Sequence, residues 1–151
     1  LLSNAVKFTE DGGHIEVRLE RNGAEARLVV RDSAAWEQVW RRARANIARP
    51  GQAPGVDFSK AVVIVATLGE RPVTGFWISV DSSVSTTAHR IVYVTRSTIE
   101  RDCPRGQALT RPIDIVTVAN DGLPITFEER EVIWPECGFG RPSPPSLVPD
   151  P

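Results

Sequence analysis

The chain has 151 residues; 41% of them are hydrophobic, 25% are charged, and 18 basic side chains balance 19 acidic ones. These values suit one folded domain of ordinary size, and they argue against wholesale disorder and against a nucleic-acid-binding surface, which usually carries a strong basic excess. The longest apolar stretch, residues 61–66, is far shorter than the roughly 20 residues of a membrane-spanning helix.

The start of the chain suggests a fragment or a processed product. The sequence contains no methionine and begins with Leu1 and Leu2. Its first residues also lack the charged segment followed by an apolar segment that marks a signal peptide. We therefore expect any signal or anchor to lie upstream of Leu1.

Residues 1–32 predict a short helix followed by a β-hairpin. Residues 1–9 place apolar side chains at helical spacing, and a turn signal follows at residues 11–13. Apolar side chains then alternate along residues 15–20 and again along residues 26–31, on either side of Asn22-Gly23. Because Asn-Gly is a strong signal for a two-residue turn, these two segments are expected to pair.

Residues 33–48 predict one amphipathic helix. Asp32 or Ser33 is a suitable N-cap, an apolar stripe includes Trp36 and Trp40, and arginines gather toward the C-terminal half, before Pro50-Gly51. A basic helix with tryptophans can bind a nucleic acid or a membrane. We interpret this helix instead as packed on the core, with its arginines in solvent.

Residues 61–134 predict a series of short strands separated by glycine and proline turns. The expected strand segments are residues 62–65, 76–80, 91–95, 113–118 and 125–134. The predicted fold is α+β but mainly β: an antiparallel β sandwich or barrel-like sheet, with one packed helix (about residues 33–48) and a short N-terminal helix.

Residues 135–151 contain half of the 12 prolines and predict an extended tail. The two cysteines leave two alternatives open. In an oxidising compartment Cys103 and Cys137 could form one disulfide, which would anchor the tail to the loop before the 113–118 strand. The other alternative is a pair of free thiols.

No catalytic or metal-binding constellation can be assembled from the sequence. The only histidines, His14 and His89, show no spacing that places them beside a serine or Cys103, and no CxxC motif occurs. We therefore expect no enzymatic activity, no metal and no cofactor.

The loop at residues 69–75 is the most motif-like segment. It is either a tight turn before an aromatic strand or a partner-binding loop, since loops at the end of a β scaffold often carry binding residues. Because neighbouring strand residues point to opposite faces, Phe76 and Trp77 cannot both face the core, and the exposed ring is the better contact candidate. The candidate partner-binding residues are Gly69, Glu70, Arg71, Pro72, Gly75 and Trp77.

Residues 1–9 (LLSNAVKFT), with Gly12-Gly13 and the hairpin after them, resemble the N-box region of the histidine-kinase ATPase domain. The resemblance implies that Asn4 would hold a magnesium ion and that Lys7 would approach the phosphates of ATP. Asp32 matches the aspartate of the next box, but residues 33–35 (SAA) replace its glycines and no glycine-rich lid follows. Asn4 and Lys7 are therefore expected to be vestigial and inactive.

Residues 29–134 resemble the PrcB-type domain, the C-terminal domain found in a family of protease-associated proteins. The residues that carry this likeness are 29–40, 56–60, 68–72, 75–76, Cys103, 107–110 and Pro112. At residues 73–74 the chain has Val-Thr where the family tends to have a small or glycine-containing turn. The resemblance implies a small, exported, β-rich bacterial domain in the cell envelope or outside the cell, with a protein partner that could be a surface protease.

The two resemblances meet at residues 29–32 and divide the chain into three segments. These are a histidine-kinase-ATPase-like fragment (1–32), a PrcB-like domain (30–134) and a proline-rich tail (135–151). The functional hypothesis is a non-enzymatic protein-interaction module associated with a secreted or surface protease. The alternative is a truncated, inactive ATP-binding segment or a chimeric fragment with no selected function.

Overall fold

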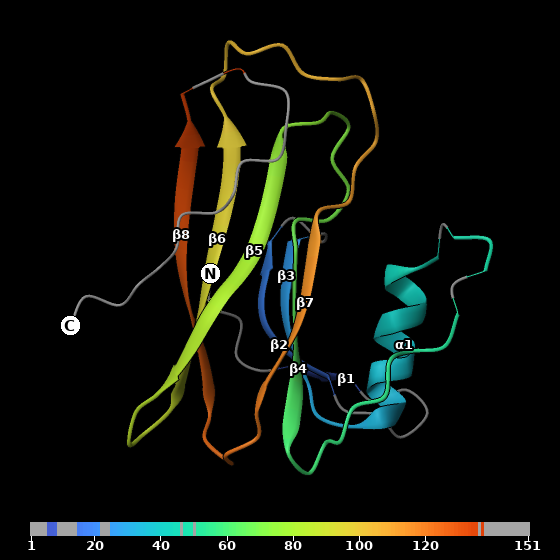
Figure 1. Ribbon diagram of the computed structural model, residues 1–151, viewed down its shortest axis with the longest axis vertical. Helices are drawn as coiled ribbons and strands as arrows, with labels where there is room; N and C mark the ends of the chain where they lie inside the picture. The colour runs from blue at the N-terminus through green and yellow to red at the C-terminus, as the bar shows by residue number, and fades with distance from the viewer. Residues whose placement is uncertain are drawn as a thin grey trace.

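The computed structural model describes residues 6–8, 15–21, 25–45, 47–49, 51–135 and 137, without the side chains of residues 6–8 and 18–21. In this part of the chain eight strands and one helix follow one another (Figure 1). In chain order they are β1 (Val6–Phe8), β2 (Ile15–Arg21), β3 (Glu25–Val30), α1 (Ser33–Ala43), β4 (Ala61–Thr67), β5 (Phe76–Ser85), β6 (Arg90–Ile99), β7 (Ile113–Ala119) and β8 (Ile125–Trp134).

The elements form three layers (Figure 1). A five-stranded sheet with the order β1-β2-β3-β4-β7 lies between helix α1 and a three-stranded sheet with the order β5-β6-β8. The predicted class, mainly β with one packed helix, is confirmed.

Strand β4 explains why the five-stranded sheet is covered on both faces. Its even-numbered residues from 62 to 66 pack against the three-stranded sheet, with Ile78 and Val94. Its odd-numbered residues, Val63 and Val65, pack against Trp36 of α1. A strand buried on both faces needs a continuous apolar run, and residues 62–66 supply one.

The predicted all-antiparallel core is wrong at one pair of strands. Strands β6 and β8 are parallel, with Arg90 opposite Ile125 and Ile99 opposite Trp134. Parallel neighbours need a connection that brings the chain back to its starting end. Strand β7 makes that return in the other sheet, so β8 runs in the same direction as β6.

The helix predicted for residues 1–9 is wrong for Val6–Phe8, which form the edge strand β1. Val6 lies opposite Val17 and Phe8 opposite Ile15 in antiparallel register. A short apolar run fits both the helical and the strand period, and pairing with β2 decides for the strand. The rest of that predicted helix lies outside the described residues. The hairpin of β2 and β3 agrees with the prediction, and β3 joins it to β4.

Helix α1 begins where expected and ends early. Asp32 is its N-cap, and the Asp32 carboxylate accepts a hydrogen bond of 2.8 Å from Ala35 N. The predicted end at residue 48 is wrong, because the helix ends at Ala43. Ile47, the next large apolar residue, is 45% exposed, so further turns would gain little packing.

Cys103 and Cys137 form a disulfide, with their Cα atoms 5.3 Å apart. The register of β6 and β8 accounts for the pairing. Ile99 and Trp134 are opposite each other at the ends of two parallel strands, and each cysteine follows within four residues. Of the two alternatives that the sequence left open, the structure has the bonded one. In the part of the chain described, no helix is long and apolar enough to cross a membrane.

Candidate functional site

Two loops lie together at one end of the sheets. Residues 68–75 connect β4 to β5, and residues 103–112 lead from the turn after β6 into β7. We call these two segments the double loop. Arg71 and Thr110 form an isolated antiparallel bridge with two hydrogen bonds of 2.8 Å. Leu68 N also donates to Pro112 O (3.0 Å).

The tip of the first loop is bonded to the second loop as well. Thr74 N donates to Gly106 O (3.0 Å), and Gly106 N donates to the Thr74 hydroxyl (2.7 Å). Pairing of this kind avoids the free-energy cost of leaving backbone N–H and C=O groups without hydrogen-bond partners. Each loop therefore fixes the position of the other.

The Arg105 guanidinium ties the double loop to the strands. Its Nη1 donates to Thr74 O and Gly75 O, both at 3.2 Å. Its Nη2 donates to Thr98 Oγ1 (3.1 Å) and Ile99 O (3.0 Å), both on β6. The guanidinium carbon also lies 4.6 Å from the centre of the Phe76 ring, within the range of a cation–π contact.

Gly75 leaves the space that this guanidinium occupies. Its φ is +97°, a conformation that side-chain-bearing residues rarely adopt. A Cβ atom there would lie 2.6 Å from Arg105 Nη1 and 3.0 Å from Ile99 Cδ1. The glycine that the sequence singled out as a contact residue is thus required by the packing of the loop.

A buried ion-pair network holds the base of the double loop. Arg27, fully buried on β3, donates to Glu25 (2.9 Å) and to Glu129 of β8, and Arg96 of β6 donates to Glu25 (3.0 Å). The Arg71 guanidinium lies 3.8 Å from the Glu25 carboxylate. The network therefore joins both sheets to the loop.

Glu25 and Arg96 each favour the charged form of the other. Burial of the Glu25 carboxyl opposes its ionisation, but the hydrogen bonds from Arg96 and Arg27 outweigh burial and lower its pKa. Burial likewise opposes the charge of Arg96, and the bond to Glu25 outweighs it and raises the pKa of Arg96. Both shifts therefore favour the ionised pair.

The outer side of the double loop carries mixed chemistry. Glu70 and Arg111 form an ion pair at 2.8 Å with half-exposed side chains. Pro72 is exposed, and Leu109 is the most exposed large apolar residue described, at 62%. Leu109 and Arg111 were missed by the sequence reasoning. Leu109 belongs to the segment 107–110 that carries the PrcB-type resemblance, and it is an apolar residue in a segment without strand alternation. Arg111 had no signal of its own.

The six candidate partner-binding residues divide between surface and interior. Glu70 and Pro72 are exposed, whereas Arg71 points toward Glu25 and Gly75 is buried. Gly69 has φ +71° and makes the turn.

Trp77 lies on β5, outside the loop itself. Ile78 faces the core, so Trp77 points to the opposite face of the three-stranded sheet, where it is half-buried. Of the two vestigial nucleotide positions, Asn4 lies outside the described residues. Lys7 is in β1, and its side chain is not described.

The described residues hold no group of three or more histidine, cysteine, aspartate or glutamate side chains that could bind a metal ion. The fold and the double loop define a small two-sheet β domain that carries a rigid loop pair at one end.

Residues 62–119 match the family model described as PrcB C-terminal. The match runs from β4 to β7 and includes the whole double loop, while α1 and β8 lie outside it. No curated protein and no solved structure gives a significant match. The PrcB-type resemblance is confirmed for residues 62–119 and stays a prediction for the rest of 29–134. No finding supports a histidine-kinase fragment at residues 1–32.

Proposed function

We propose that this chain is a non-enzymatic module for protein–protein interaction and that the double loop is the surface that contacts the partner. The observation that carries the proposal is a pair of loops fixed by each other and by Arg105, with Glu70, Pro72, Leu109 and Arg111 on the outside. A surface that is ordered before binding loses little conformational entropy when the partner binds.

A secreted or surface protease is the partner class that we propose. The support is the match of the double loop and its strands to the PrcB C-terminal model. The PrcB-type resemblance implies a protein partner of this class. The disulfide between Cys103 and Cys137 agrees with a location in the cell envelope or outside the cell, since disulfides persist in oxidising compartments. It also means that Cys103 is not a free nucleophile.

The test uses the full chain immobilised through its C-terminus and exposed to a bacterial envelope fraction. Captured proteases are detected by their proteolytic activity and identified by mass spectrometry. The decisive variant is Leu109→Ser, which removes the most exposed apolar side chain of the surface. Loss of one apolar anchor is expected to weaken capture about tenfold or more.

Val84→Ser is the matched control. Val84 is also an exposed apolar residue, at 41%, but it lies near the β5–β6 hairpin, at the opposite end of the sheets from the double loop (Figure 1). Capture of a protease that depends on Leu109 and not on Val84 would support the proposal. Equal losses in the two variants would rule out the double loop, and no captured protease would rule out the partner class.

A further inference from the structure

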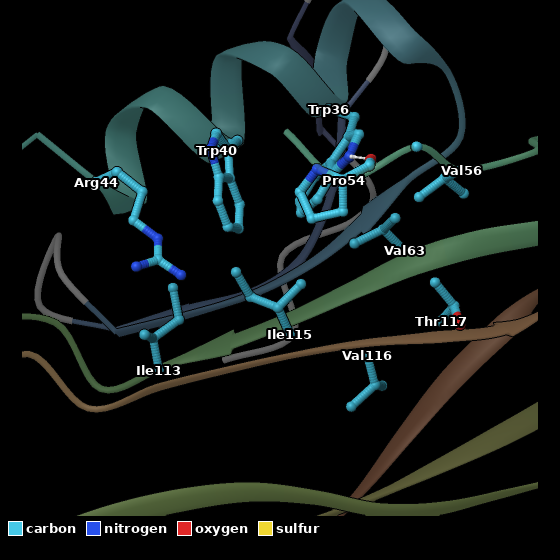
Figure 2. A pocket seen from close by; sticks show the side chains of 11 residues that line it. Trp36, Trp40, Arg44, Pro54, Val56, Val63, Ile113, Ile115, Val116 and Thr117 are labelled. Atoms are coloured by element: carbon cyan, nitrogen blue, oxygen red, sulfur yellow. Dashed lines mark hydrogen bonds between the residues drawn. The ribbon is translucent and has the colours of Figure 1, made fainter. Parts of the chain in front are cut away.

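A groove lies between helix α1 and the five-stranded sheet, on the face away from the three-stranded sheet (Figure 2). Its volume is about 490 Å³, within the range that holds a small ligand or a large side chain. Trp36 and Trp40 line the helix side, and Ile113 and Ile115 of β7 lie across from them. Pro54 lines the groove beside Trp36.

The tryptophans are held in place by the segment after the helix. Trp36 Nε1 donates to Pro54 O at 2.9 Å, which satisfies the polar atom of a nearly buried ring. The ring centres of Trp36 and Trp40 are 5.6 Å apart. Trp40 is half-buried and Ile113 is 38% exposed, so the groove opens to solvent between them.

One end of the groove carries a cation with no carboxylate partner among the described residues. The Arg44 guanidinium lies 4.4 Å from the centre of the Trp40 ring and points from the helix toward Ile113 (Figure 2). Residues 36–56 contain four arginines and a single carboxylate, Glu37. Among the described residues, none of these four arginines forms an ion pair. The segment that supplies both tryptophans and Arg44 to the groove therefore carries a net positive charge.

We propose that this groove binds an acidic, apolar segment of a partner polypeptide. One large apolar side chain of that segment occupies the space between Trp40 and Ile115, and a carboxylate beside it pairs with Arg44. A carboxylate and a guanidinium form charge-assisted hydrogen bonds that are stronger than neutral ones. This inference rests on the proposed function only in that the ligand is a protein, because the groove is a different surface from the double loop.

The charge around the groove favours a polypeptide over a fatty acid. A fatty acid brings one carboxylate, which Arg44 alone would satisfy. Arg41 and Arg42 directly follow Trp40 in the chain, and Arg49 comes two residues before Gly51, whose carbonyl accepts a hydrogen bond from Trp40 Nε1. All three arginines are exposed and form no ion pair among the described residues, so this segment presents a positive region around Arg44. Several carboxylates along one peptide would complement that region, and such complementarity also speeds association.

The test uses the full, disulfide-bonded chain labelled with ¹⁵N and three capped pentapeptides as probes. The first has phenylalanine between two pairs of aspartates. The second replaces the aspartates by lysines, and the third replaces the phenylalanine by serine. The readout is the indole Nε1–H signal of each tryptophan, with Trp77 and Trp134 of the three-stranded sheet as internal references.

The acidic phenylalanine peptide is expected to shift the signals of Trp36 and Trp40 saturably and to bind at least about tenfold more tightly than either other peptide. Arg44→Gln should weaken its binding about tenfold. Arg101→Gln, which removes an exposed arginine beyond the end of β6, should change it less than about twofold. Leu109→Ser should leave it unchanged, so failure at the double loop and failure at the groove are distinguishable.

Three results would overturn the inference. The first is equal binding of the acidic and basic peptides, and the second is no saturable shift below about 1 mM peptide. The third is saturable binding of sodium decanoate without binding of the acidic peptide, which would identify a fatty-acid site. Arg44 is half-exposed, so Arg44→Gln is expected to fold, and its unfolding midpoint in urea verifies this.

Discussion

Replacing Gly75 by alanine is expected to destabilise the protein more than an ordinary glycine substitution would. The alanine would have to keep a φ of +97°, which costs about 1–2 kcal/mol of backbone strain for a residue with a side chain. It would also lie 2.6 Å from Arg105 Nη1, so the guanidinium must move away from Thr74 O and Gly75 O. Losing one hydrogen bond to a charged donor costs about 1.5–3 kcal/mol. The expected loss is therefore about 3–5 kcal/mol.

Two other glycines separate these contributions. Gly122 has φ +75° with nothing within 4 Å of a Cβ, so Gly122→Ala should cost only the strain, about 1–2 kcal/mol. Gly55 has neither a positive φ nor a neighbour within 4 Å, so Gly55→Ala should be neutral or slightly stabilising. The assay is urea unfolding followed by circular dichroism. If Gly75→Ala costs no more than Gly122→Ala, Arg105 does not hold the double loop as described.

Three further predictions concern the whole fold. Cys103→Ser removes the disulfide, which joins residues separated by 34 positions, and should lower the free energy of unfolding by about 4 kcal/mol. In the wild-type protein, a thiol-alkylating reagent should modify neither cysteine until the disulfide has been reduced. Glu25→Gln leaves Arg27 and Arg96 without their shared carboxylate and should cost about 3–5 kcal/mol in urea unfolding at pH 7. Because the pKa of Glu25 is lowered in the folded protein, the stability that its carboxylate contributes is present above the unfolded pKa and is lost as the pH falls through the folded pKa. Glu25→Gln should therefore lose less stability on acidification than the wild type does. The same loss of stability with falling pH in both proteins would contradict the network. A chain without residues 1–31 should show no cooperative thermal unfolding. It would lack the two fully buried valines of β3, and the edge of β4 that pairs with β3 would be uncovered. Cooperative unfolding of this shortened chain would show that the PrcB-like segment folds alone.

The parts of the fold that the sequence predicted are those with a local signal. Asn22-Gly23 indicated the hairpin, Asp32 indicated the start of α1, and the β-branched run in residues 62–65 indicated the strand buried on both faces. Each of these depends on neighbouring residues alone. The parallel pairing of β6 and β8 has no such signal, because it depends on β7 joining the other sheet.

The buried network was missed because alternation along β3 was interpreted as one inner and one outer face. Arg27 falls on the face opposite Leu28, and a polar residue in such an alternation is typical of a solvated face. The structure buries it completely, because the three-stranded sheet covers that face too. Val29, on the same face as Arg27 and also fully buried, was the one residue that indicated a second covered face.

For the candidate site, the sequence located the first loop and not its partner. Residues 69–75 carry glycine and proline signals, whereas Arg105 and Leu109 belong to a segment without a regular pattern. Their roles depend on which carbonyl groups β6 and the first loop present to them. Such contacts are set by tertiary packing, and no spacing of residues along the chain encodes them.

The ion pair between Arg27 and Glu129 has a consequence for how the chain folds. These residues are 102 positions apart in the sequence, and β6 and β8 meet only after β7 has crossed to the other sheet. Proteins dominated by such distant pairings fold in about milliseconds to seconds, because long loops must close before the contacts stabilise them. The three-stranded sheet is not complete until β8, the last strand in the described part of the chain, has been synthesised, so a nascent chain would expose the unpaired edge of β6 until then.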